Sequence, residues 1–129
     1  MVIDTSALMC ILLGESEAEE CARAIAADWK RLLSTFSALE SSIVIEAKKG
    51  EAGGRELDLL LWRAGIEIVP FEGKQFELAR QAWKSYGKGR HPAGLNIGDC
   101  CAYALSKLAG EPLLFKGEDF SKTDVLSVL

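Results

Sequence analysis

The sequence predicts an α/β fold: a mainly parallel central sheet of four to five strands flanked by helices. Short apolar runs of strand length alternate along the chain with longer amphipathic segments of helical period. No linker, repeat or low-complexity stretch interrupts the 129 residues, of which 49% are hydrophobic and 26% charged. Because strands that alternate with helices are joined by right-handed crossovers, we expect a parallel sheet and one domain over residues 1–129.

The first third of the chain contains two predicted strands and two predicted helices. Residues 1–4 form a short apolar run that ends in an acid, as expected for a buried strand. Residues 5–13 have helical spacing and stop at a glycine. The capping-box pattern SEAE at 16–19 opens a second helix, predicted over residues 16–29. The apolar run RLLSTF at 31–36 is predicted to be the second strand.

The middle of the chain contains two predicted helices followed by one strand. SALE is a second capping-box pattern and predicts a helix over residues 37–49. Three glycines within 50–54 predict a loop, and 56–64 has the period of another amphipathic helix. IEIVPF at 66–71 is predicted to be a strand, and its Pro70 indicates that it ends at an edge or a turn.

The last third contains two helices and two short strands. Residues 74–86 carry an apolar stripe at helical spacing, and the Gly/Pro-rich segment 87–95 is predicted to be the longest loop. Residues 97–108 are helical and mostly apolar. The runs 112–115 and 125–129 are predicted to be strands, the second of them short.

The composition narrows the classes of function. A net charge of −4 argues against a protein that neutralises many phosphates with its own Lys and Arg side chains. The single histidine, His91, gives little basis for a histidine zinc site or a Ser-His-Asp triad. No CxxC pattern occurs among the four cysteines, which are expected to be buried reduced thiols: Cys10, Cys21, Cys100 and Cys101. No apolar run approaches the roughly 20 residues that span a bilayer, and no signal peptide is recognisable, so a cytoplasmic location is expected.

Four acids lie at the ends of the predicted elements. Asp4 ends the first strand, Glu40 lies in the first turn of the helix after the second strand, and Asp119 follows the fourth strand. Asp99 lies three residues after Asn96, the predicted N-cap of helix 97–108. Because loops after parallel strands share one edge of the sheet, the four carboxylates are expected to converge there.

Each acid also has a purely structural explanation, as a helix cap or a turn residue. Together, however, four carboxylates at one edge would repel one another and raise one another's pKa. A divalent cation removes that conflict, and Mg²⁺ or Mn²⁺ favours carboxylate oxygens and water. Such an ion activates water for phosphodiester cleavage without a Ser or Cys nucleophile or a histidine base.

Four segments, in this order and spacing, resemble the PIN-domain ribonucleases, specifically the VapC-type toxins of toxin–antitoxin pairs: MVIDTSAL at 1–8, SALESSIVIEA at 37–47, LNIGDCCAYALSK at 95–107 and LLFKGEDFSKTD at 113–124. The resemblance implies a parallel sheet flanked by helices and a Mg²⁺- or Mn²⁺-dependent endoribonuclease. It also implies a homodimer and a small antitoxin protein that blocks the site.

The resemblance assigns roles to individual residues. Asp4 and Asp99 look like the primary metal ligands, and Glu40 and Asp119 would complete the site, partly through water. It implies supporting polar roles for three further residues: Thr5, Ser6 and Asn96.

Basic side chains near the expected site are candidate contacts to RNA phosphates: Lys84, Lys88, Arg90, His91, Lys116 and Lys122. Each of them is also compatible with an ordinary solvated surface. The tryptophans lie on apolar helical stripes and are predicted to pack in the core or in a dimer interface: Trp29, Trp62 and Trp83.

Other interpretations remain open at this point. A receiver-like signalling domain has a phosphorylated Asp at a strand end, but it also carries an acidic pair that Asp4 lacks. A haloacid-dehalogenase-like phosphatase would have a second Asp where Ser6 lies. An ExK nuclease motif is present at 46–48, but in a predicted helix instead of a strand. A non-catalytic interaction module would use the four acids as caps and turns only, and metal binding separates it from an enzyme.

Overall fold

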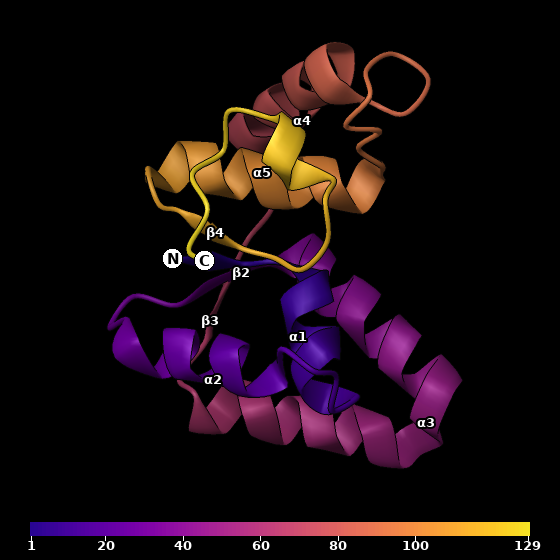
Figure 1. The fold of residues 1–129 in the computed structure, drawn as a ribbon, viewed down its shortest axis with the longest axis vertical. Helices are drawn as coiled ribbons and strands as arrows, with labels where there is room; N and C mark the ends of the chain where they lie inside the picture. Colours follow the sequence, from indigo (N-terminus) through magenta and orange to yellow (C-terminus); the bar gives the residue numbers. More distant parts are fainter.

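The computed structural model describes all 129 residues (Figure 1). It contains four strands, five α-helices and one 3-10 turn, in this order: β1 (Val2–Ile3), α1 (Thr5–Leu12), α2 (Ala18–Ala27), β2 (Leu32–Ser34), α3 (Thr35–Arg63), β3 (Glu67–Val69), α4 (Gly73–Tyr86), α5 (Ile97–Ala109), β4 (Leu113–Leu114) and η1 (Phe120–Lys122). None of the helices combines the length and the low polarity that crossing a membrane requires.

The sheet is parallel throughout, with strand order β3-β2-β1-β4. This confirms the predicted α/β class. The predicted fifth strand at 125–129 is reduced to one bridge between Ser127 and Leu113. The Leu113 amide donates to Leu126 O at 2.8 Å, and the Val128 amide donates to Leu113 O at 3.1 Å. The C-terminal segment therefore lies beside β4, but it pairs with the sheet at a single residue because β4 itself is only two residues long.

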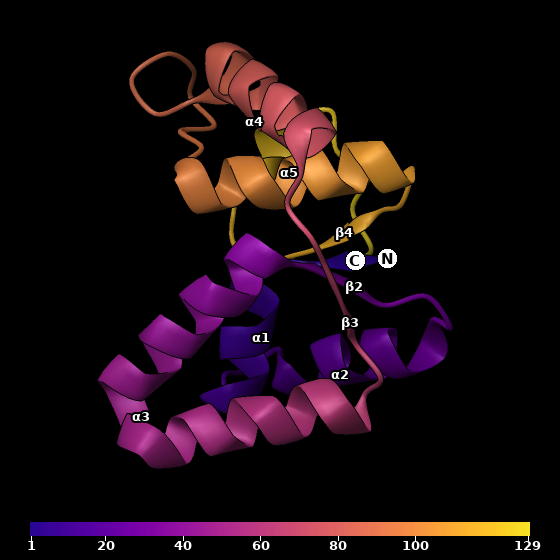
Figure 2. The same ribbon diagram turned by 180° about the vertical axis from the view of Figure 1, so that it is seen from behind.

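Alternating strand residues supply the cores on the two faces of the sheet. Ile3, Leu33 and Leu114 pack with α1, α2 and α3 in one buried cluster. Their neighbours Val2, Leu32 and Leu113 pack with α4 and α5 in the other. Figure 2 shows the resulting layers, with α1–α3 on one side of the strands and α4 and α5 on the other. The period of two along each strand thus separates the cores.

The structure corrects the predicted start of the third helix. Ser34, not Ser37, is the N-cap of α3, because its hydroxyl oxygen accepts a hydrogen bond from the Phe36 amide at 3.3 Å. The predicted loop at 50–54 is a kink within one long helical element, where Gly50 has φ of 66°. Gly53 lies inside the second half, where a Cβ would come within 2.8 Å of Ile45 O, so a side chain would separate the two halves.

The predicted cap of α2 is wrong, and the tryptophans lie outside the core. Ser16 does not cap α2: the N-cap is Glu17, which makes no side-chain capping bond, and the Ser16 hydroxyl donates to the Glu17 carboxylate at 2.7 Å instead. Of the two locations predicted for the tryptophans, the core is excluded, since Trp29 is 90% exposed and Trp62 79% exposed, and Trp83 is also exposed; packing in a dimer interface stays a prediction. The four cysteines, in contrast, are buried free thiols as predicted.

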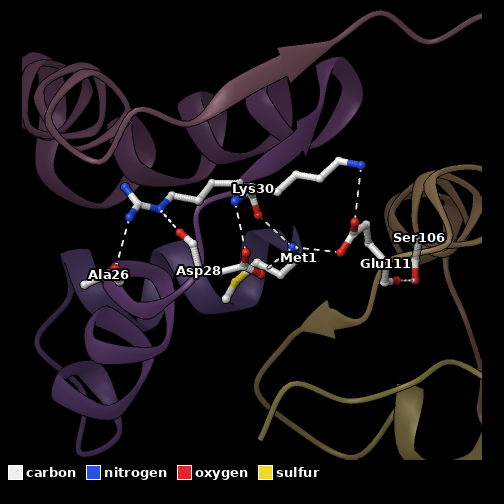
Figure 3. Close-up of polar contacts among 7 residues, drawn as sticks. Met1, Ala26, Asp28, Lys30, Ser106 and Glu111 are labelled. Atoms are coloured by element: carbon white, nitrogen blue, oxygen red, sulfur yellow. Dashed lines mark hydrogen bonds and ion pairs between the residues drawn. The ribbon is translucent and has the colours of Figure 1, made fainter.

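A polar cluster closes the edge of the sheet opposite the strand ends (Figure 3). The α-ammonium group of Met1 donates to Asp28 Oδ2 at 2.7 Å, to Lys30 O at 2.7 Å and to Glu111 Oε2 at 3.3 Å. Lys30 Nζ also pairs with Glu111 Oε1 at 3.2 Å. These bonds join the start of β1 to the connections that lead into β2 and β4, and so help to fix the strands in register.

Candidate functional site

Asp4 lies directly after β1 and is the N-cap of α1. Its Oδ2 accepts hydrogen bonds from the Ser6 amide at 3.0 Å and the Ser6 hydroxyl at 2.6 Å. The residue is only 5% exposed, and none of the ion pairs of the structure includes it. Burial raises the pKa of Asp4, the hydrogen bonds from Ser6 oppose the rise, and the charge of Glu40 adds to it. Capping alone does not require such a buried, uncompensated carboxylate.

Glu40 lies within α3, where its carboxylate is held between Thr5 and Gly98. The Thr5 hydroxyl donates to Glu40 Oε1 at 2.6 Å. A Cβ on Gly98 would come within 2.5 Å of Glu40 Oε2, so the carboxylate occupies the space that a side chain would fill. The predicted N3 capping role of Glu40 is wrong, because α3 begins at Thr35 and places Glu40 beyond its first turn. The contact with Gly98 was not predicted, although a glycine directly before an acid in a helix start is a visible signal.

Asp99 and Asn96 form the predicted capping box at the start of α5. The Asp99 amide donates to Asn96 Oδ1 at 2.9 Å, and the Asn96 amide donates to Asp99 Oδ2 at 3.0 Å. Burial raises the pKa of Asp99 to about 7, against the lowering effect of the Asn96 hydrogen bond. The charges of Asp4, Asp119 and Glu40 raise it further.

Asp119 lies between β4 and η1 and is exposed, without a side-chain capping bond. Its charge nevertheless contributes to the raised pKa of Asp99. The charges of Asp4, Glu40 and Asp119 therefore all act on Asp99, as expected for acids that lie near one another. The four acids come from four separate parts of the chain: the end of β1, α3, the start of α5 and the loop after β4.

The four acids are nevertheless not in mutual contact. The tightest group of potential metal ligands is elsewhere: ligand atoms of Cys10, Glu15 and Glu17 lie within 4.8 Å of one another. No three of the four predicted acids meet that spacing. An ion held by one or two carboxylates and several waters does not need three carboxylates in contact. The predicted supporting residues do contact the acids, since Thr5 bonds Glu40 and Ser6 bonds Asp4.

The predicted basic residues lie in different environments. Lys84, Lys88 and Arg90 are exposed on the end of α4 and the following loop, and Arg90 lies 4.1 Å from the centre of the Trp83 ring. Lys122 is exposed in η1 and makes no ion pair. The other two members of the predicted set make internal contacts: Lys116 pairs with Glu15 and Glu17, and His91 Nδ1 accepts a hydrogen bond from the Ala93 amide at 3.0 Å.

An apolar groove of about 510 Å³ adjoins the site. It lies between the start of α3, α4 and the start of α5, and its largest side chains are aromatic: Phe36, Phe71, Phe76 and Trp83. Asn96 and Ile97 at the start of α5 also line it, and Ile97 is 71% exposed. The stripe pattern of α4 indicated an apolar face, but it did not predict that this face would stay uncovered.

The family model described as PIN domain matches residues 1–126. Ribonuclease VapC30 of Mycobacterium tuberculosis is 56% identical over 128 residues, which cover 99% of this chain and 98% of the relative. Ribonuclease VapC of Mycolicibacterium smegmatis is 57% identical over 128 residues, with 99% of each chain covered. A chain of a toxin–antitoxin complex from Klebsiella pneumoniae shares the fold, with a TM-score of 0.75 and 16% identity over 99% of this chain and 97% of that one.

These matches confirm the resemblance to PIN-domain ribonucleases and give no support to a receiver-like domain or a non-catalytic module. The chain therefore belongs to the PIN-domain family and, within it, to the VapC ribonucleases.

Proposed function

We propose that this chain is the toxin of a type II toxin–antitoxin pair and an endoribonuclease that cleaves RNA with a water activated by Mg²⁺, for which Mn²⁺ can substitute. The main support for the metal site is Asp4, a buried carboxylate without a cationic partner. Its charge and that of Glu40 raise the pKa of Asp99. The names of the relatives, ribonuclease VapC, support the reaction class. The shared fold with a chain of a toxin–antitoxin complex accords with an antitoxin partner.

The donor set fits a hard divalent cation, because all four acids offer only carboxylate oxygens. Asp4 and Asp99 would be the primary ligands, with Glu40 and Asp119 completing the site in part through water. Ser6 binds Oδ2 of Asp4, and the Asn96 amide binds Oδ2 of Asp99, so Oδ1 of each is the oxygen left for a ligand. A bound divalent ion lowers the pKa of its water and stabilises charge on the phosphate.

The chain's own residues orient these carboxylates before any ion binds. Thr5 fixes Glu40 against Gly98, and Ser6 fixes Asp4. Burial of Asp4 excludes bulk water from its side of the site, where electrostatic interactions are stronger than in solvent. The arrangement is therefore preorganised for a cation, which limits the entropy lost when the ion and the substrate bind.

The RNA would approach along α4 and the following loop. Five Lys or Arg residues and one acid lie between residues 73 and 91, in a chain whose net charge is −4. Lys84, Lys88 and Arg90 would contact phosphates on this side, and Lys122 on the side of Asp119. Phosphate contacts of this kind position the substrate without reading its sequence.

The apolar groove supports a homodimer. Phe36 lines both this groove and a neighbouring depression that includes Leu39 and Ile43, so the uncovered apolar surface continues along α3. Contiguous exposed apolar surface of this kind marks protein interfaces. A second copy of the chain seated there would cover it.

The four free thiols are consistent with a cytoplasmic location.

The test is cleavage of a structured RNA pool by the antitoxin-free protein, with Mn²⁺ or with EDTA. Wild type is expected to cleave only with the metal, and Asp4→Asn is expected to lose cleavage while remaining folded. Asp58→Asn, which removes an exposed acid of α3, is the matched control and is expected to cleave like wild type. Metal-independent cleavage, or full activity in Asp4→Asn, would contradict the proposal.

A further inference from the structure

Lys116 lies at a junction between the candidate site and the corner where α1 leads into α2. It follows β4 and precedes the loop that carries Asp119. Its ammonium group makes a close ion pair with Glu15 and a second one with Glu17 at 3.2 Å. Its backbone amide donates to the Ser6 hydroxyl oxygen at 3.0 Å. One residue thus contacts two distant parts of the chain, through its side chain and its backbone.

The side chain of Lys116 supplies the cation that the α1–α2 corner needs. Ligand atoms of Glu15, Glu17 and Cys10 lie within 4.8 Å of one another, a spacing that would also suit a metal ion. The Lys116 ammonium contacts both glutamates, and their carboxylates raise the pKa of Lys116 well above its usual range. A lysine held in this way is poorly placed to contact an RNA phosphate, in contrast to Lys122.

The backbone amide of Lys116 connects this corner to the site through its hydrogen bond to Ser6. A serine hydroxyl carries one proton, so when Ser6 Oγ accepts from the Lys116 amide, its own proton is free to point elsewhere. That proton goes to Asp4 Oδ2, at 2.6 Å. The two bonds form a chain from Lys116 through Ser6 to Asp4, and they determine which oxygen of Asp4 is occupied.

Lys116 also fixes one end of the segment that holds Asp119. The other end is held by Asp124, which accepts from the Tyr103 hydroxyl at 2.6 Å and from Lys107 Nζ at 2.9 Å. Between these anchors, Phe120 is buried. Asp119 itself is exposed and makes no side-chain capping bond. Its position therefore depends on the anchors of the segment, and Lys116 is the one nearest to Asp4.

We infer that Lys116 is a positioning residue: its ion pairs with Glu15 and Glu17 hold its amide on Ser6, which orients Asp4 and sets the start of the Asp119 segment. Its effect on cleavage rests on the proposed function, whereas its effect on geometry does not. In this role, Lys116 does not contact an RNA phosphate.

The test compares Lys116→Met with the double variant Glu15→Gln/Glu17→Gln, which removes the same ion pairs from the other side. Lys116→Arg is the conservative variant, and Lys48→Met, an exposed lysine of α3 outside any ion pair, is the charge-matched control. Three quantities are measured: hydrogen exchange of the Lys116 amide without metal, Mn²⁺ affinity without RNA, and kcat and KM for RNA.

Lys116→Met and the double glutamine variant are expected to speed exchange of the residue 116 amide and to weaken Mn²⁺ binding about tenfold, as loss of outer-shell partners does. Both are expected to lower kcat with KM unchanged, and combining them is expected to add little because they break the same ion pairs. Lys116→Arg is expected to retain most of the amide protection. Lys48→Met is expected to match wild type in amide exchange and in Mn²⁺ affinity.

Unchanged amide protection in Lys116→Met would overturn the inference. A raised KM, with a salt dependence of RNA binding reduced by about one ion, would also overturn it and identify Lys116 as a phosphate contact. If wild type binds no Mn²⁺, the proposed metal site fails, but the amide exchange still decides the positioning role.

Discussion

Removing the charge of Asp99 is predicted to stabilise the metal-free protein while it abolishes function. Asp99→Asn retains an oxygen that can accept from the Asn96 amide, so the capping box can persist. It removes a carboxylate whose pKa is raised to about 7 by burial and by the charges of Asp4, Asp119 and Glu40. Ionising Asp99 at neutral pH therefore destabilises the folded protein, as expected at a site that binds a cation.

The expected change in the free energy of unfolding follows from the pKa of Asp99. The folded value of about 7 lies about three units above the ordinary value of 3.8. At about 1.4 kcal/mol per unit this is about 4 kcal/mol as an upper limit. Partial exposure of Asp99 to solvent screens its charge, so we expect the free energy of unfolding of Asp99→Asn to exceed that of wild type by about 1–3 kcal/mol at pH 8.

The stability contributed by Asp99 depends on pH in a defined direction. Because the folded pKa of Asp99 lies above the unfolded one, its contribution to stability is present below about pH 4 and is lost as the pH rises through about 7. The advantage of Asp99→Asn over wild type should therefore be small at pH 4 and full at pH 8. Urea unfolding in EDTA at both pH values measures it, with Asp58→Asn as the control for loss of a surface charge. An Asp99→Asn protein that unfolds at a lower urea concentration than wild type at pH 8 would contradict this prediction.

Three further predictions concern other parts of the molecule. Gly98→Ala should displace the Glu40 carboxylate and reduce the cleavage rate about tenfold without unfolding α5, as measured by kinetics and by circular dichroism. Unchanged cleavage would mean that the Glu40 side chain has room to shift. Phe76→Glu places a charge in the apolar groove and should convert a dimer into a monomer in analytical ultracentrifugation, whereas a monomeric wild type would remove the dimer proposal. The Met1 ammonium and the Lys30 amide lower the pKa of Asp28, so its stabilising contribution is present above about pH 4 and is lost as the pH falls through the folded pKa. Asp28→Asn should therefore lower the free energy of unfolding by at most about 1 kcal/mol at pH 7, and by less as the pH falls; a loss that does not shrink with falling pH would contradict this.

The features that could be predicted from the sequence are those that depend on residues close together in the chain. Asn96 and Asp99 are three residues apart and bond one another, so their capping box was visible in four letters. Asp4 was conspicuous because an acid ends an apolar strand. The alternation of apolar runs with helical segments was also sufficient to predict the parallel sheet.

Long-range contacts were not accessible in this way. SALE matched a capping box, but the strand β2 ends earlier, so Ser34 caps the helix and Glu40 is free to accept from Thr5, 35 residues away. The ion pair of Lys116 with Glu15 spans 101 residues, and no sequence pattern marks it. An apolar stripe such as that of α4 is the same whether a core or a partner covers it, so the exposure of Trp83 could not be predicted either.

The proposed metal site is tested most directly by the anomalous scattering of Mn²⁺ in a crystal of the metal-loaded wild-type protein. We expect a peak at the carboxyl edge of the sheet, with oxygens of Asp4 and Asp99 about 2.0–2.3 Å from the ion, as for inner-sphere carboxylates. Crystals of Asp4→Asn are expected to show no such peak. Density only at the Glu15–Glu17 corner, or a peak at the sheet edge that survives Asp4→Asn unchanged, would contradict the proposed site.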